Sequence, residues 1–114
     1  MNFAPLPAVD VTAVPADGFV LDVREADEWA AGHVEGALHI PMSEFVARFG
    51  ELTEAAEDGR RVHVMCRVGG RSAQVTQYLV QQGVDAVNID GGMLAWESAG
   101  RPMVTDHGGQ AFVA

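Results

Sequence analysis

Short apolar runs rich in β-forming residues alternate with stretches of helical periodicity along nearly the whole chain. The runs at residues 19–23, 37–40, 62–66 and 86–89 are expected strands. The expected helices cover residues 26–31, 43–50, 51–57, 72–82 and 92–99. Strands separated by helices form βαβ units, whose strands are parallel and whose sheet is covered by helices. The order of the runs therefore predicts an α/β fold with a largely parallel sheet between helices.

The length and composition suit one globular domain. The 114 residues are 48% hydrophobic and 20% charged, with no internal repeat and no second-domain boundary. We expect a single domain over residues 1–114 with its core at about 8–104, and a flexible segment at 105–114, where little pattern is present. No apolar run reaches the roughly 20 residues that span a bilayer, and Pro5, Pro7 and Pro15 interrupt a start that lacks basic residues. The sequence thus predicts a cytoplasmic protein with no membrane association.

The charge of the chain limits its partners. Seven arginines and no lysine face sixteen acidic residues, which gives a net charge of -9. An acidic chain repels phosphate backbones, so we expect no nucleic-acid partner.

The only cysteine, Cys66, is the main candidate for chemistry. A single cysteine excludes an intramolecular disulfide and a multi-cysteine metal site. Cys66 ends an expected strand, and Gly69 and Gly70 follow it before an expected helix, so backbone amides can turn inward as an anion-binding nest. Arg67 and Arg71 add two cations. Although a lone cysteine is often only a small buried hydrophobe, this setting predicts a thiol that ionises easily and attacks an anionic substrate.

Several motifs in the same order as in a known family make the resemblance explicit. They are Leu21-Asp22-Val23-Arg24-Glu25, Glu28-Trp29, Gly32-His33-Val34-Glu35-Gly36-Ala37-Leu38-His39-Ile40-Pro41, Cys66-Arg67-Val68-Gly69-Gly70-Arg71-Ser72 and Asp90-Gly91-Gly92-Met93-Leu94-Ala95-Trp96-Glu97 with Gly100 and Pro102. On these motifs, residues 8–104 resemble a single-domain rhodanese, a sulfurtransferase of the thiosulfate type. The resemblance implies a three-layer α/β/α fold with a five-stranded, mostly parallel sheet.

The resemblance also implies a reaction. Cys66 would take a sulfane sulfur from thiosulfate or a persulfide donor, become a persulfide, and pass the sulfur to cyanide or a thiol acceptor. The implied cradle for that sulfur is the backbone of Arg67, Val68, Gly69, Gly70, Arg71 and Ser72. Arg71 would fix the loop and bind anionic substrate, and Arg67 would be the more exposed cation. No metal and no organic cofactor are implied.

Three other functions stay open at this stage. One is a relay module whose persulfide is loaded and unloaded by partner proteins, and another is a non-catalytic interaction domain. The third is a phosphatase or arsenate reductase on the same scaffold. Cell-cycle phosphatases that resemble rhodaneses have five residues between the cysteine and the arginine, whereas four separate Cys66 from Arg71 here. The shorter loop favours sulfur chemistry, and the sequence does not fix an oligomeric state.

The remaining polar candidates are expected to have structural roles. Asp22 and Arg24 lie near the end of an adjacent expected strand and can form an ion pair that supports the cysteine loop, with an N-cap by Asp22 as the alternative. His33 is expected to pack or to form hydrogen bonds. Trp96 is expected to pack in the core or at an edge, and because it follows the Asp90-Gly91-Gly92 turn, the wall of a pocket is the alternative.

Overall fold

The computed structural model describes residues 5–114 and contains one parallel five-stranded sheet. Its strands are β1 (Ala8–Asp10), β2 (Phe19–Asp22), β3 (Leu38–His39), β4 (Val62–Met65) and β5 (Ala86–Asp90). They pair in the order β1-β5-β4-β2-β3, and every pair is parallel. β4 is central, and all of its residues are buried. The prediction of an α/β fold with a five-stranded parallel sheet is confirmed.

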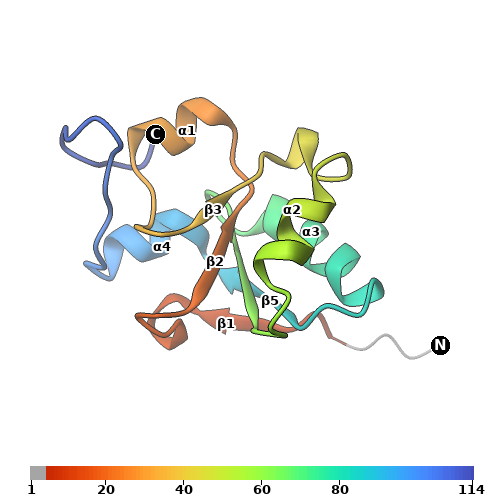
Figure 1. Cartoon of the computed structure of the whole chain (residues 1–114). Helices are drawn as coiled ribbons and strands as arrows, with labels where there is room; N and C mark the ends of the chain where they lie inside the picture. The colour runs from red at the N-terminus through yellow and green to blue at the C-terminus, as the bar shows by residue number, and fades with distance from the viewer. Residues whose placement is uncertain (1–4) are drawn as a thin grey trace.

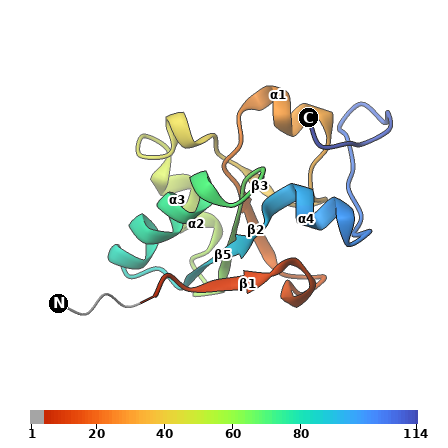
Figure 2. The ribbon, with the colours of Figure 1, turned by 180° about the vertical axis from the view of Figure 1, so that it is seen from behind.

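Helices cover both faces of this sheet, as the order of the sequence predicts. The α-helices are α1 (Ala26–Ala31), α2 (Phe49–Ala55), α3 (Gly70–Gln81) and α4 (Gly92–Ser98), with 3-10 turns η1 (Val11–Ala13) and η2 (Met42–Glu44). Figure 1 shows α2 and α3 on one side of the sheet and α4 on the other, and the view from behind in Figure 2 agrees. Helix α1 lies beyond the carboxyl ends of the strands. Within residues 5–114, no helix is long and apolar enough to span a bilayer.

The sheet separates two hydrophobic cores. Under α2 and α3, the buried side chains Leu52, Val75 and Leu79 pack on strand residues such as Leu21 and Val64. The second core lies under α4 and η1 and contains Val11, Val20, Met65, Ile89, Met93 and Trp96. Successive strand residues face opposite sides of a sheet, so Val64 enters one core and Met65 the other. Each core fixes one face of the strand that leads to Cys66.

The helix expected over residues 43–50 is the one clear error in element type. The chain forms the 3-10 turn η2 and a further turn there, and α2 begins only at Phe49. Ser43 is of a type that often caps a helix start, but its hydroxyl donates to Glu25 Oε1 at 3.0 Å. Arg48 then has φ -107° and ψ 13°, outside the helical region. Because this tertiary hydrogen bond engages the Ser43 hydroxyl, the serine does not cap a helix at this position.

Two smaller differences concern element boundaries. Strand β1 is absent from the apolar pattern because its three residues lie at an edge and are mostly exposed. Helix α3 begins at Gly70 rather than at Ser72, because Gly69 has a left-handed φ of 112° and serves as the N-cap. The helix therefore starts four residues after Cys66, which brings its first amides close to the sulfur.

Candidate active site

Cys66 lies at the carboxyl end of the sheet, directly after the central strand β4. The equivalent ends of its neighbours carry Arg24 after β2 and Gly91 after β5. The carboxyl ends of parallel strands share one edge, which is where α/β folds place their functional crevices. Cys66 itself is 1% exposed. Its thiol is therefore held inside the loop that connects β4 to α3.

Hydrogen bonds from this loop converge on the sulfur. The Gly69 amide donates to Cys66 Sγ at 3.0 Å, and Ser72 Oγ lies 3.2 Å from the same atom. Burial raises the pKa of the Cys66 thiol and is the largest single influence. Hydrogen bonds have the opposite effect, and together they hold the pKa of Cys66 below its usual value. The largest of these effects comes from the Ser72 hydroxyl, and the others come from the amides of Ser72, Gly69 and Val68. The site therefore makes the thiol easier to ionise than a free cysteine, despite its enclosure.

The Ser72 hydroxyl is itself held by Asn88, a residue that sequence reasoning missed. Ser72 Oγ donates to Asn88 Oδ1, and Asn88 Nδ2 donates to the Gly69 carbonyl at 3.2 Å. Asn88 is 5% exposed and lies in β5, so the sheet fixes its amide. The sequence does indicate this residue, because Asn88 interrupts the apolar run at residues 86–89. A polar side chain in a buried strand needs hydrogen-bond partners.

The N-terminus of α4 supports the loop from the opposite side. The amides of Met93 and Leu94 donate to the carbonyls of Cys66 and Arg67, at 2.9 Å and 3.1 Å respectively. A side chain at Gly92 would place its Cβ 2.6 Å from the Arg67 carbonyl oxygen. The Asp90-Gly91-Gly92 motif thus allows a helix start to approach the cysteine loop closely.

Arg71 forms a two-bond ion pair with Glu28 of α1. Arg71 Nη1 and Nη2 donate to Glu28 Oε1 and Oε2 at 2.7 Å and 2.9 Å. The hydrogen bonds from Arg71 lower the pKa of Glu28 to about 2, and Glu28 in turn raises that of Arg71. Glu28 belongs to a matched motif, but sequence reasoning gave it no role. The pair fixes the end of the loop and neutralises much of the charge that an anionic substrate would meet.

The second cation of the loop is also engaged. Arg67 Nε donates to the main-chain oxygen of Ala114 at 2.9 Å. Between the two arginines, the side chain of Val68 is 56% exposed. The outer surface of the loop therefore carries less available positive charge than its two arginines alone would give it.

Asp22 and Arg24 form a buried ion pair beside the site. Arg24 Nη2 lies 2.8 Å from Asp22 Oδ2, and neither residue is exposed. Arg24 also donates to the main-chain oxygens of Glu28 and Gly32, which hold α1 in place. The amide of Val23 donates to the Met65 carbonyl at 2.9 Å, next to the cysteine. The pair thus holds the helix that carries Glu28, and it supports the site through that helix.

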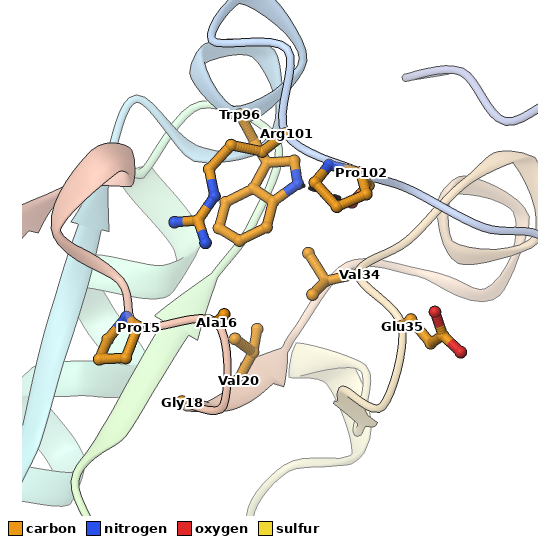
Figure 3. Close-up of a pocket in the computed structure, with 9 residues that line it drawn as sticks. All are labelled: Pro15, Ala16, Gly18, Val20, Val34, Glu35, Trp96, Arg101 and Pro102. Carbon is orange, nitrogen blue, oxygen red and sulfur yellow. Dashed lines mark hydrogen bonds between the residues drawn. The ribbon is translucent and has the colours of Figure 1, made fainter.

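The histidines and tryptophans of the matched motifs have packing contacts. The rings of His33 and His39 stack on Trp29, at centroid distances of 3.6 Å and 4.6 Å. Trp96 is 3% exposed and donates from Nε1 to the Pro102 carbonyl. It lines a cavity of about 290 Å³ beside Arg101 (Figure 3), and no residue of the Cys66 loop lines that cavity. Among residues 5–114, no three His, Cys, Asp or Glu side chains are grouped to hold a metal ion.

The parallel sheet and the cysteine loop at its carboxyl edge define an α/β protein with an activated thiol. Residues 10–99 match the family model of the rhodanese-like domain, and the chain belongs to this family. It is 38% identical over 84 residues to YtwF of Bacillus subtilis, named as a candidate sulfurtransferase, across 74% of this chain and 78% of that protein. It is also 38% identical over 93 residues to a protein of Allochromatium vinosum named sulfurtransferase, across 81% and 83% of the two chains.

A solved structure supports the same assignment. The crystal structure of a rhodanese-related protein from Thermoplasma volcanium superposes with a TM-score of 0.78 at 28% identity. The superposition covers 88% of this chain and 99% of that one. The fold is therefore the rhodanese fold over nearly the whole length of both proteins.

Proposed function

We propose that this protein is a sulfurtransferase that carries sulfane sulfur as a persulfide on Cys66. The convergence of the Gly69 amide and the Ser72 hydroxyl on a buried sulfur supports this function most directly. These donors lower the pKa of the Cys66 thiol, and a thiolate is the reactive nucleophile. The family membership and the names of the relatives agree with sulfur transfer.

In the loading step, the Cys66 thiolate attacks the outer sulfur of thiosulfate or of a persulfide. The new S–S bond forms on Cys66 as the donor S–S bond breaks, and sulfite or a thiolate leaves with the electron pair. The terminal sulfur of the Cys66 persulfide carries a negative charge. Loop amides that point inward, including those of Gly69 and Ser72, are placed to stabilise that charge.

In the unloading step, an external nucleophile attacks the terminal sulfur. Cyanide would leave as thiocyanate, and a thiol would leave as a new persulfide, with the Cys66 thiolate restored in both cases. Since the chain has no second cysteine, it cannot resolve the persulfide internally. A reducing compartment such as the cytoplasm suits this chemistry, because it keeps an unloaded Cys66 as a thiol.

A partner protein is a second candidate donor, and the state of the two arginines favours it. Both terminal nitrogens of Arg71 donate hydrogen bonds to Glu28, and Arg67 donates one to Ala114. Neither guanidinium is therefore fully available to thiosulfate. The net charge of -9 also repels a small dianion at long range. A persulfide on a basic protein would be attracted by the same charge. The chain would then act as a relay module with slow turnover on thiosulfate.

Intact mass of the wild type and of Cys66→Ser tests these proposals. Each protein is incubated with thiosulfate or with glutathione persulfide, and its mass is measured before and after addition of cyanide. We expect the wild type alone to gain one sulfur atom, which cyanide removes as thiocyanate. A gain from the persulfide but not from thiosulfate would show that Cys66 takes sulfur from a persulfide, as a relay requires. No gain from either small donor in folded, reduced protein would contradict loading by small molecules, and loading by a persulfide on a basic carrier protein would then be compared with phosphatase activity.

A further inference from the structure

The segment over residues 105–114 lies beyond α4 in the chain, and its end lies beside α1 in both views (Figure 1, Figure 2). Hydrogen bonds connect it to α1, to α4 and to the cysteine loop. Its main-chain contacts are Phe112 N–H to the Ala31 carbonyl at 3.0 Å, Val113 N–H to Glu97 Oε2 at 3.3 Å and Arg67 Nε to the Ala114 oxygen at 2.9 Å. The segment therefore lies beside the residue that follows Cys66.

Gly32 provides the space in which this segment packs. A Cβ at Gly32 would lie 2.7 Å from the Phe112 carbonyl oxygen and 2.8 Å from its nitrogen. The φ of Gly32 is 167°, an extended conformation that any residue adopts. The glycine is thus required by the approach of the segment and not by its own backbone. The Phe112 side chain is 54% exposed, so the main chain makes this contact.

A contact between a histidine ring and a carboxylate attaches the start of the segment. His33 Nε2 lies 3.2 Å from Asp106 Oδ1, and the adjacent Val104 exchanges two backbone hydrogen bonds with His33. The Asp106 side chain is 78% exposed. Exposed ion pairs contribute little to stability. The segment is consequently held by weaker contacts than the sheet and helices that surround the rest of the loop.

We propose that residues 111–114 form a movable wall of the entrance to Cys66 and that this wall selects acceptors by size. Cys66 is 1% exposed, so an acceptor must pass the groups around the loop to reach its sulfur. One of those groups is Arg67, to which Ala114 is bonded. Cyanide can pass a closed wall, whereas a cysteine on a folded protein brings a surface that displaces it. This inference rests on the proposed sulfur transfer for its chemistry, although not for its geometry.

Two substitutions displace the wall by different routes. Gly32→Ala places a methyl group against the Phe112 main chain, and Asp106→Ala removes the carboxylate that contacts His33. Gly50→Ala is the matched control, because a Cβ at Gly50 meets nothing within 4 Å. Each protein is loaded with sulfur, and its discharge by cyanide and by a single-cysteine variant of ubiquitin is followed by intact mass.

We expect the two displacing substitutions to speed discharge by the ubiquitin thiol between about twofold and about fivefold. This is the range that the loss of one exposed polar contact covers, and the methyl group of Gly32→Ala should weaken the attachment of the segment by a similar amount. Discharge by cyanide, and both reactions of Gly50→Ala, should change less than about twofold. Equal acceleration by both acceptors would overturn size selection, because it would indicate general loosening of the loop. Unchanged ubiquitin rates in both variants would overturn the wall itself.

A second readout separates this inference from the proposed function. Cys66 is alkylated with iodoacetamide and, separately, with a maleimide that carries a long poly(ethylene glycol) chain. Gly32→Ala and Asp106→Ala should raise the rate with the bulky reagent relative to that with iodoacetamide. The ratio needs no sulfur loading, so it tests the wall even where loading fails. A ratio equal to that of the wild type in both variants would contradict the wall, whatever the outcome of the sulfur assays.

Discussion

The Ser72 hydroxyl has one hydrogen and two neighbours that can accept it, the Cys66 sulfur and the Asn88 amide oxygen. With a neutral thiol, the S–H group can donate to Ser72 while Ser72 donates to Asn88. With a thiolate, the hydroxyl must turn toward the sulfur to stabilise the charge. Asn88 Oδ1 therefore accepts the Ser72 hydrogen when Cys66 is a neutral thiol. It loses that hydrogen bond when Cys66 is a thiolate.

Replacing this hydroxyl should make the thiol less reactive. Ser72→Ala removes the strongest of the hydrogen bonds that lower the pKa of Cys66, so that pKa should rise. A hydrogen bond to a charged group contributes ~1.5 kcal/mol or more, so alkylation by iodoacetamide at pH 7 should slow about tenfold. The measurement is the alkylation rate against pH. Ser98→Ala, at an exposed serine of α4, is the control. A profile unchanged by Ser72→Ala would show that the hydroxyl does not stabilise the thiolate.

At the scale of elements, α4 positions the loop through its first turn. Gly92→Ala would place a methyl group against the Arg67 carbonyl oxygen, at a residue whose φ is +57°. Both the close contact and the left-handed backbone are unfavourable, so we expect a loss of ~2 kcal/mol or more in the free energy of unfolding. Sulfur loading should slow as well, because the loop must shift. Urea unfolding and the rate of mass gain measure the two effects.

Gly59→Ala separates these two causes. Gly59 has a similar φ of +74°, but a Cβ there meets nothing within 4 Å. It should lose only the part of the stability that backbone conformation accounts for, ~1 kcal/mol. Equal losses in Gly59→Ala and Gly92→Ala, with loading unaffected, would contradict a role for the close approach of α4 to the loop.

The ion pair between α1 and α3 should give the protein a specific acid sensitivity. Since the pKa of Glu28 falls from its ordinary 4.5 to about 2 on folding, its pairing stabilises the fold fully above pH 4.5. This contribution is lost as the pH falls from 4.5 toward 2. Subtracting the unfolding free energy of Glu28→Gln from that of the wild type should therefore give a difference that shrinks over this range. The exposed Glu54→Gln is the control, and a difference constant with pH would contradict the pairing.

The contrast between expected and observed elements has a physical origin. The strands that lead to the site are buried, so their apolar composition identifies them in the sequence. The edge strand β1 and the turn after Pro41 depend on contacts with distant residues, such as the hydrogen bond from Ser43 to Glu25. The same holds within the site. The loop from Cys66 to Ser72 is continuous in sequence, whereas Glu28 and Asn88 reach it only through the tertiary fold.

At the scale of the whole molecule, charge and site act in opposite directions on an anionic donor. The chain carries a net charge of -9, and the two arginines of the cysteine loop, Arg67 and Arg71, contact Ala114 and Glu28 respectively. The amides that face the sulfur act only at short range. A dianion therefore meets repulsion during its approach and stabilisation only after it arrives.

Salt should consequently increase the rate of sulfur loading from thiosulfate. Raising the ionic strength from about 0.01 M to about 0.15 M shortens the Debye length from about 30 Å to about 8 Å, which screens the long-range repulsion. We expect the second-order rate of mass gain on Cys66 to rise about threefold or more over this range. Alkylation of Cys66 by neutral iodoacetamide is the control for effects of salt on the thiol itself. If loading slows with salt while alkylation is constant, local attraction by Arg67 and Arg71 outweighs the repulsion of the whole molecule. Thiosulfate would then be a better-matched donor than the charge of the chain indicates.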